Sequence, residues 1–202
     1  MTTAVLDPVI DESIYLPLPA LSSPATLAQA LANRRSSRAF RPDPLPLPLL
    51  SALLWSADGV NRKHSGERTA PSAHNWKEIE VYAVMREGAY RYDAPAHRLC
   101  RVKADDLRGA TGEQDFVASA PLNLVYAADF ARMREASADE RSFLAGADAG
   151  CIAQNVYLFC AAAGLATVVR GLIDRARLAL ALGLSPTQRI TLAQSVGYPL
   201  PA

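Results

Sequence analysis

The stretch ERSFLAGADAGCIAQNVYLFCAAAGLATVVR, Glu140 to Arg170, contains the longest helical pattern of the chain and the strand that follows it. The pattern predicts a helix over residues 140–163, and LATVVR then predicts a strand. The most apolar part, Cys151 to Leu165, spans only fifteen residues and includes Gln154 and Asn155. Because this part is too short and too polar to cross a bilayer, we predict a buried helix.

Small residues gather in the first half of this helix, at Gly146, Ala147, Ala149 and Gly150. Such a patch lets another helix approach closely, although each glycine weakens the helix by about 1 kcal/mol. The neighbouring helix can belong to the same core or to a second subunit. The pattern alone leaves both interpretations open.

The segments on either side of this helix predict a sheet. IEVYAVM (79–85) alternates as a strand does, YRYD and HRLCRV form a hairpin around residues 94–96, and APLNLVYAA (120–128) is a further strand. After Arg170 come the helix DRARLALAL (174–182) and a final strand, RITLAQSVG (189–197). Helices and strands mix without a regular βαβ order, so we predict an α+β fold.

Prolines divide the N-terminal part of the chain. Residues 1–22 predict an extended arm, because three prolines interrupt any helix there. A first helix is predicted from Ser23, a candidate N-cap followed by Pro24, to about Arg34. A stiff proline-rich connection leads to a second helix, predicted over residues 47–58 and ending before a glycine.

Residues 60–78, VNRKHSGERTAPSAHNWKE, are polar and contain Gly66 and Pro71. They predict a long ordered loop, and such loops inside compact domains often carry function. No internal repeat and no change of composition marks a linker. We therefore predict a single domain over residues 23–202, preceded by the arm 1–22.

The composition is that of a folded globular protein, with 202 residues, 50% of them hydrophobic and 20% charged. A formal net charge of +1 gives no general basic field for nucleic acid. The N-terminal residues lack the basic start and apolar run of a signal peptide, so we expect a cytoplasmic protein without a membrane anchor. Cys100, Cys151 and Cys160 lack CxxC spacing and predict neither a disulfide framework nor a zinc site.

Several common catalytic and nucleotide-binding motifs do not occur in the sequence. It contains neither GxGxxG nor GxxxxGK[ST], and neither GxSxG nor HExxH. The three histidines have no spacing that would place two of them on one helical face. Hydrolase and metalloenzyme interpretations therefore lose their usual support, and no metal site is predicted.

A cluster of cations follows the first predicted helix, in ANRRSSRAF (32–40). Arg34, Ser36 and Arg38 alternate, so in an extended segment their side chains share one side and can bind a phosphate. The residues between them then face elsewhere. Alternatively, arginines at a helix C-terminus only complement its dipole, for about 0.3–1 kcal/mol each, and the spacing alone does not decide.

Six segments together resemble the nitroreductase-like flavoprotein family: ALANRRSSRAF, RTAPSAHN, YRYDAPAHRL, SAPLNLVYAADF, DAGCIAQNVYLFCAAAGL and SVGYP. They occur in that family's order, and the resemblance runs from Tyr15 to Pro199. YLPLP, RTAPSA and YRYDAPAHRL are most similar to the branch of SagB-type dehydrogenases, some of which oxidise azolines to azoles in peptide maturation. The Lys-Tyr dipeptide associated with that oxidation is absent, which argues against this particular activity.

The resemblance implies a central, mostly antiparallel sheet flanked by helices, an intertwined homodimer, and one FMN in each of two clefts between the subunits. Arg34, Ser36 and Arg38 match the segment that binds FMN, with the arginines on the phosphate. Other matched positions lie in the loop that a partner subunit lays over the flavin and in the segment beside the ring; they are Ser72, Ala73, Asn75, Val169, Arg170 and Gly171.

The function implied is that of an FMN-dependent oxidoreductase, which transfers hydride between NADH or NADPH and a small organic acceptor by a ping-pong mechanism. Because FMN carries this chemistry, no catalytic side chain is required and none is assigned. Two alternatives stay open. The protein could keep the fold but bind flavin poorly and act as a binding or interaction module, or it could consume reduced flavin as a substrate.

Three features depart from the family pattern. The chain ends GYPLPA, whereas many relatives have Lys or Arg beyond this point to help hold the phosphate. Arg170 stands where relatives often have a small, apolar or acidic residue; its cation could stabilise reduced FMN, bind an acidic substrate, or turn outwards to solvent. HNWKE (74–78) is unusual, so we expect His74, Trp76 and Lys77 to shape this protein's own pocket, with His74 either a proton donor or a hydrogen-bonding loop residue.

Overall fold

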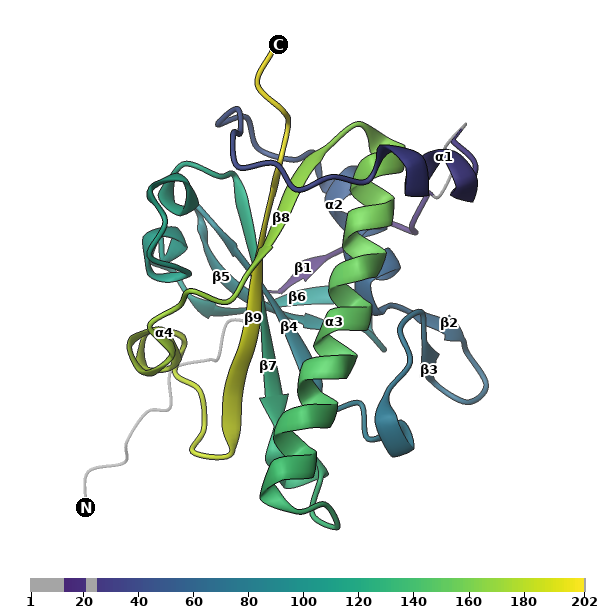
Figure 1. Ribbon diagram of the computed structural model, residues 1–202, viewed down its shortest axis with the longest axis vertical. Helices are drawn as coiled ribbons and strands as arrows, with labels where there is room; N and C mark the ends of the chain where they lie inside the picture. The colour runs from purple at the N-terminus through teal and green to yellow at the C-terminus, as the bar shows by residue number, and fades with distance from the viewer. Residues whose placement is uncertain (1–12, 21–24, 202) are drawn as a thin grey trace, which may run out of the picture.

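Seven strands form the central sheet of the computed structural model, which describes residues 13–20 and 25–201 (Figure 1). Their order is β1-β6-β5-β4-β7-β9-β8, and every neighbouring pair is antiparallel. The predicted α+β fold with a mostly antiparallel sheet is confirmed. The strands are β1 Ile14–Tyr15, β2 Val60–Arg62, β3 Glu67–Arg68, β4 Ile79–Met85, β5 Gly88–Asp93, β6 Arg98–Lys103, β7 Leu122–Asp129, β8 Ala166–Arg170 and β9 Gln188–Gly197.

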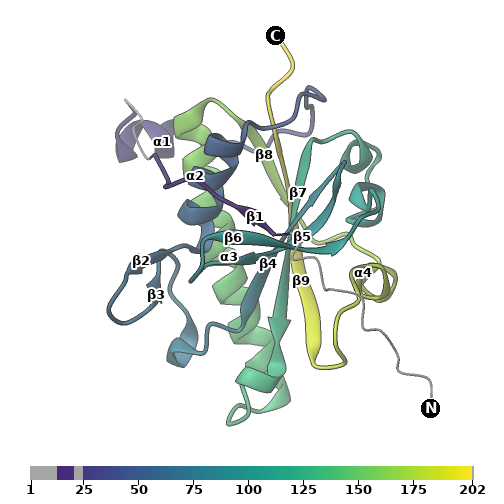
Figure 2. The same ribbon diagram turned by 180° about the vertical axis from the view of Figure 1, so that it is seen from behind.

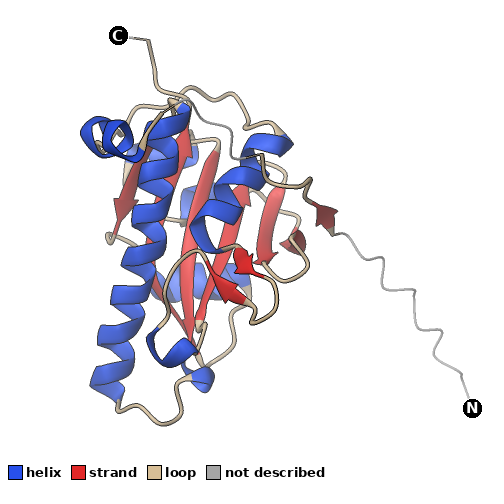
Figure 3. Cartoon of the chain, turned by 90° about the vertical axis from the view of Figure 1, so that its right-hand side faces the viewer, coloured by secondary structure: helices blue, strands red, loops and turns tan. Residues whose placement is uncertain are grey.

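Helices pack on both faces of this sheet. α2 and α3 cover the face to which Val81 and Ala83 point, and Figure 3 shows these two helices in front of the strands. α4 covers the other face, where Tyr82 and Val84 point, as the two-residue period of β4 requires. None of the helices that the structure describes has the length and hydrophobicity of a membrane span. The helices are α1 Leu27–Asn33, α2 Leu47–Asp58, α3 Ala138–Ala163 and α4 Arg175–Leu182, with 3₁₀ turns at Ala73–Asn75, Arg108–Ala110, Asp115–Ala118 and Phe130–Arg132.

The sequence of α3 sets both of its ends. Ser137 caps the N-terminus in a capping box with Glu140, so the helix begins at Ala138, slightly before the predicted start. Gly164, with a φ of 70°, ends it in the left-handed conformation that glycine adopts without strain. One side of the helix packs into the core and consists of Ala145, Asp148, Ala149, Ile152, Ala153, Val156, Tyr157 and Cys160.

Another side of α3 faces open space. A Cβ added at Gly146 or Gly150 would meet no atom within 4 Å, and the Phe143 side chain is 75% exposed. These two glycines therefore do not serve helix packing within the chain's own core. The other interpretation of the small-residue patch, a subunit interface, stays a prediction.

The first helix begins later than predicted. Thr26 caps α1, and its Oγ1 accepts a hydrogen bond from the Gln29 N–H while the Gln29 side chain accepts one from the Thr26 N–H. This complete capping box is a stronger start signal than Ser23 followed by Pro24. Both residues of the predicted start lie outside the described part of the chain. The predicted boundary between arm and domain lies there too, and it stays a prediction.

The described part of the predicted arm, residues 13–20, is extended and lies beside β6 (Figure 2). β1 pairs with β6, and the Leu16 N–H donates to the His97 carbonyl at 3.1 Å. Leu16 is buried in the main core, which anchors this segment. The remaining parts of the predicted arm, residues 1–12 and 21–22, lie outside the described residues.

The polarity of residues 60–68 predicted a loop, and this prediction is wrong. They form the antiparallel pair β2 and β3, which turns at Gly66 with a φ of 66°. Two short strands of polar side chains show no apolar alternation, so the sequence pattern missed them. Residues 69–78 remain irregular apart from the 3₁₀ turn at Ala73–Asn75.

Candidate functional site

Tyr157 joins the cation-rich segment to α3 and β8. Ser36 Oγ lies 2.7 Å from the Tyr157 hydroxyl, and the Arg34 guanidinium lies 5.4 Å from the centre of the Tyr157 ring. The same hydroxyl accepts a hydrogen bond from the Val169 N–H at 3.0 Å. Arg34 and Ser36 therefore share one side of the extended segment, as the alternating pattern predicts. Arg38 is exposed, and its convergence on the same point stays a prediction.

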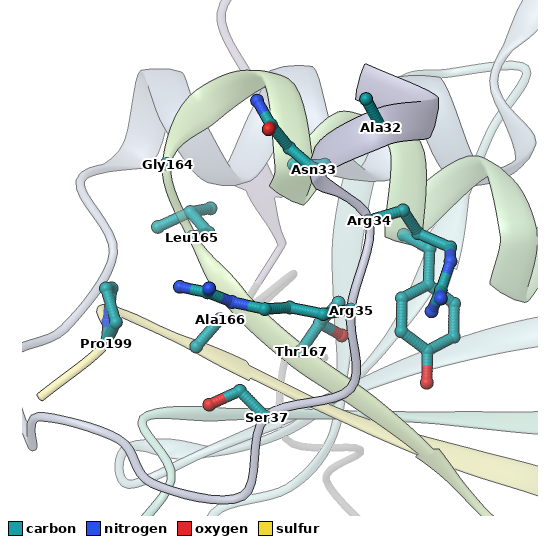
Figure 4. A pocket seen from close by; sticks show the side chains of 12 residues that line it. Ala32, Asn33, Arg34, Arg35, Ser37, Gly164, Leu165, Ala166, Thr167 and Pro199 are labelled. Carbon is teal, nitrogen blue, oxygen red and sulfur yellow. The ribbon is translucent and has the colours of Figure 1, made fainter. Parts of the chain in front are cut away.

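A pocket of about 380 Å³ opens beside this contact. Arg34 and Arg35 leave the backbone in different directions, and Arg35 extends between Leu165 and Ala166 towards Pro199 (Figure 4). None of the lining residues is acidic, so a pocket with two guanidiniums suits an anion. Its lining consists of Ala32, Asn33, Arg34, Arg35, Ser37, Tyr157, Ala161, Gly164, Leu165, Ala166, Thr167 and Pro199.

Sequence reasoning assigned no role to Arg35 or Tyr157. Arg35 was expected to face away from the site, yet it lines the pocket. The Ser37 N–H donates a hydrogen bond to Thr167 O at 2.9 Å. That backbone bond places the segment against the start of β8. Tyr157 carried a weak signal: a tyrosine on a buried helix needs a partner for its hydroxyl.

At the end of β8, the backbone of Gly171 is exposed whereas the side chain of Arg170 is buried. Gly171 is exposed and a Cβ there would meet open space, so its backbone is accessible. Arg170 is 4% exposed and points into the protein, so the alternative that it turns outwards to solvent is wrong. Its Nη1 donates to Thr111 O at 2.8 Å and its Nη2 to Asn123 Oδ1 at 3.0 Å. A side chain at Gly112 would overlap the guanidinium, so glycine makes room for it.

Burial lowers the pKa of Arg170 to about 10, well below its usual range. Among the described residues no carboxylate forms a salt bridge with it, and its Nε has no hydrogen-bond partner. The strand alternates, so Arg170 lies on the side of β8 away from Val169. Hydrogen bonds within the chain occupy both terminal nitrogens, and the side chain serves to fix the end of β8.

The loop at residues 72–77 is tied to two carboxyl groups. Ser72 Oγ donates to Glu78 Oε2 at 3.0 Å and accepts from the Lys77 N–H at 2.8 Å. The Ala73 N–H donates to Asp148 Oδ2 at 2.7 Å. The His74 ring stacks on Trp76 with 4.4 Å between ring centres. The loop has a defined shape, built from hydrogen bonds to Glu78, just before β4, and to Asp148 of α3.

Comparison with known proteins identifies the family. The sequence profile of the nitroreductase family matches residues 31–198. The chain belongs to the nitroreductase family. A candidate nitroreductase of Methanocaldococcus jannaschii is 34% identical over 155 residues, which cover 72% of this chain and 78% of that protein. This family membership makes the protein an oxidoreductase in general terms.

Solved structures of nitroreductases share the fold. The crystal structure of a candidate nitroreductase from Ralstonia eutropha superimposes with a TM-score of 0.90 at 44% identity, covering 94% of this chain and 90% of that one. The NADPH:FMN oxidoreductase of Vibrio harveyi, solved with NAD⁺, has a TM-score of 0.64 at 20% identity and covers 86% and 68%. The finer assignment of this chain to the SagB-type branch stays a prediction.

The residues predicted for the nitroreductase site fall into two groups. Arg34, Ser36 and Val169 meet at Tyr157, whereas the loop at 72–77 is bound at Asp148. Nine positions of α3 separate these two anchors, about 13 Å along the helix at 1.5 Å per residue. One chain therefore does not bring the loop next to the cation-rich segment. The described residues also contain no group of three His, Cys, Asp or Glu side chains placed to hold a metal ion.

Proposed function

We propose that the protein is a homodimeric, FMN-dependent oxidoreductase that transfers hydride between NADH or NADPH and a small organic acceptor by a ping-pong mechanism. The observation that carries the proposal is the pocket at Arg34 and Arg35, which has two guanidiniums and an acid-free lining at the segment matched to phosphate binding. The V. harveyi neighbour, an NADPH:FMN oxidoreductase, supports the same cofactor and donor class. Together they favour a flavin-phosphate site here.

The residues present fit the phosphate of FMN. Arg34 and Arg35 would hold its charge by donating hydrogen bonds to the phosphate oxygens. Ser36 and Arg38 do not line this pocket, so their contact with the phosphate stays a prediction. Arg35 supplies a cation to the pocket beside Pro199 (Figure 4). When bound, FMN supplies a ring that accepts a hydride and passes it on.

The other matched residues would position that ring. Tyr157 holds Ser36 and the Val169 backbone in fixed relation, and the exposed edge at Gly171 leaves room for a planar group. The Arg170 side chain faces the other side of β8, so its contribution would come through the backbone. His74 is stacked on Trp76, and we assign it a role in shaping the loop.

A second copy of the chain would complete the site. The loop with Ser72, Ala73 and Asn75 lies about 13 Å along α3 from the cation-rich segment of its own chain. Two copies that pair through the open face of α3, at Gly146 and Gly150, would bring the loop of one copy to the pocket of the other. The split position of the two groups supports the homodimer.

The first test is the visible absorption spectrum of the purified protein, with the released chromophore identified by mass. We expect flavin bands and about one FMN per chain. Arg34→Ala and Arg35→Ala should each weaken FMN binding by roughly 10-fold to 150-fold, the equivalent of about 1.5–3 kcal/mol for a charged hydrogen bond. Arg177→Ala, an exposed arginine of α4, is the control and should bind FMN normally.

Two results would contradict the proposal. A colourless protein that binds no added FMN would reject the cofactor and favour a binding or interaction module that keeps the fold. Unchanged FMN affinity in both arginine variants would reject the phosphate site. Consumption of the flavin ring under air and reductant would instead identify an enzyme that uses reduced flavin as a substrate.

A further inference from the structure

The 72–77 loop adopts a strained backbone. His74, Asn75 and Lys77 have φ values of 49°, 56° and 50°, in the left-handed region that residues other than glycine rarely occupy. Each such residue costs on the order of 1–3 kcal/mol, so this shape persists only where the surroundings hold it. The groups that hold it are the carboxyls of Glu78, the residue before β4, and of Asp148, in the middle of α3.

Glu78 lacks one hydrogen-bond partner. Its side chain is fully buried, its Oε2 accepts from Ser72, and its Oε1 has no donor among the described residues. Burial raises the pKa of Glu78, and the neighbouring Asp148 raises it further through its charge and a side-chain hydrogen bond. Two carboxyl groups can hydrogen-bond each other only when one of them carries a proton. A proton on Glu78 Oε1 would satisfy the orphaned atom.

The other charged groups around this pair are Asp58, Arg68 and Lys77. Arg68 donates to Asp58 Oδ2 at 2.6 Å and to the Asp58 carbonyl at 2.9 Å, so Asp58 engages it. Burial raises the pKa of Asp58 to about 7 in spite of this partner. Lys77 lines a small cavity together with Arg68 and Asp148, and its carbonyl accepts from Arg132 Nη1 at 2.7 Å. The surroundings thus contain three carboxyl groups, those of Asp58, Glu78 and Asp148, and two cations, Arg68 and Lys77.

We propose that Glu78 and Asp148 are positioning residues that share one proton, and that this shared proton fixes the 72–77 loop in the shape that covers the flavin of a second copy. The loop's role at the flavin rests on the proposed function, whereas its shape does not. Loss of the proton puts two adjacent negative charges under the loop and breaks their mutual hydrogen bond. The loop then opens as the pH rises.

The sign follows from the direction of the shift. A carboxyl whose pKa is raised by folding stabilises the folded arrangement when protonated, and that stability is lost as the pH rises through the raised pKa. The Ala73 amide reports the loop directly, because it donates to Asp148 in the shape described here and would lose this bond if the loop opened. Above the pKa its protection should fall about tenfold per pH unit, since opening then follows the release of one proton.

The experiment measures hydrogen exchange of the Ala73 amide in the purified full chain across pH, corrected for intrinsic exchange. In Glu78→Gln, the new side-chain amide at position 78 can donate to Asp148 at every pH. Protection of the Ala73 backbone amide should therefore become independent of pH. Asp148→Ala should lose protection throughout, and Asp148→Asn, whose side chain both accepts and donates, should restore it. Two controls, Asp58→Asn and Glu87→Gln, should keep the wild-type pH step.

The proposal of a shared proton would be overturned if protection of the Ala73 amide in the wild type did not change with pH. An unchanged pH step in Glu78→Gln would overturn it as well. A step that disappears in Asp58→Asn but stays in Glu78→Gln would overturn it too, because it would assign the titration to Asp58. FMN affinity, measured on the same samples, separates the two proposals. A clear step in a protein that binds no FMN supports the shared proton and rejects the proposed cofactor.

Discussion

At the scale of single residues, one phenol determines the geometry of the candidate site. The Tyr157 hydroxyl is the meeting point of Ser36 and the Val169 N–H, two groups separated by most of the chain. A hydroxyl that accepts from a backbone N–H can still donate its own proton, so both contacts are satisfied together. The position of the cation-rich segment relative to β8 depends on this side chain and on the backbone hydrogen bond from Ser37 to Thr167.

Tyr157→Phe tests that dependence. The ring still fills its space, but the Val169 N–H loses its acceptor, so we expect the free energy of unfolding to fall by about 1–3 kcal/mol. FMN affinity should fall as well, because Ser36 and Arg34 lose their fixed position. Urea denaturation measures the first effect and flavin titration the second. Tyr15→Phe, at a tyrosine that is 66% exposed, should change neither.

Sequence alone predicted part of this site. The shared side of Arg34 and Ser36 follows from their alternation, which is a local property of an extended segment. The role of Arg35 depends on β8, which lies some 130 positions further along the chain. The buried direction of Arg170 likewise depends on Thr111 and Asn123, from distant segments. No local pattern contains such contacts.

At the scale of elements, the sequence predicted strong patterns accurately and weak ones poorly. The bounds of α2 and β4 agree with the prediction because their apolar positions are regular and their ends are marked. β2 and β3 were missed, because their pairing depends on a turn at Gly66 and not on an apolar face. α3 combines both cases: its length was predicted from the sequence, whereas the packing of its small residues was left open.

The open face of α3 gives a prediction about assembly. Gly150→Leu should leave the folded chain intact, since a side chain there meets open space in one copy. If two copies pair through this face, the added leucine blocks their close approach, so we expect the dimer to dissociate. Analytical ultracentrifugation checks this. Ala176→Leu, on the exposed side of α4, should leave the dimer unchanged, and a dimer that survives Gly150→Leu would place the interface elsewhere.

At the scale of the whole molecule, His97 connects the N-terminal segment to the core. Its Nδ1 lies 2.8 Å from the Tyr92 hydroxyl, and its Nε2 lies 2.8 Å from Ser51 Oγ and 3.1 Å from Pro17 O. A neutral ring that accepts at Nδ1 and donates at Nε2 satisfies this set. Burial lowers the pKa of His97, which favours the neutral ring.

Acid should therefore loosen this connection. For a base with a lowered pKa, the stability contributed by the neutral form is present above about pH 6.5 and is lost as the pH falls through the lowered pKa. We expect the unfolding free energy of the wild type to fall towards acid more steeply than that of His97→Gln, which cannot be protonated. Urea denaturation at neutral and mildly acidic pH compares the two. Parallel pH profiles would contradict this role for His97.

The two anchors along α3, at Tyr157 and Asp148, also have a consequence for inheritance. Under the proposed pairing, the phosphate-binding arginines of every site come from one polypeptide and the covering loop from the other. A variant without the two arginines and a variant without a working loop would each be inactive alone. Mixed together, they would form hybrid dimers in which one site is wholly wild type, so two defective alleles would complement each other.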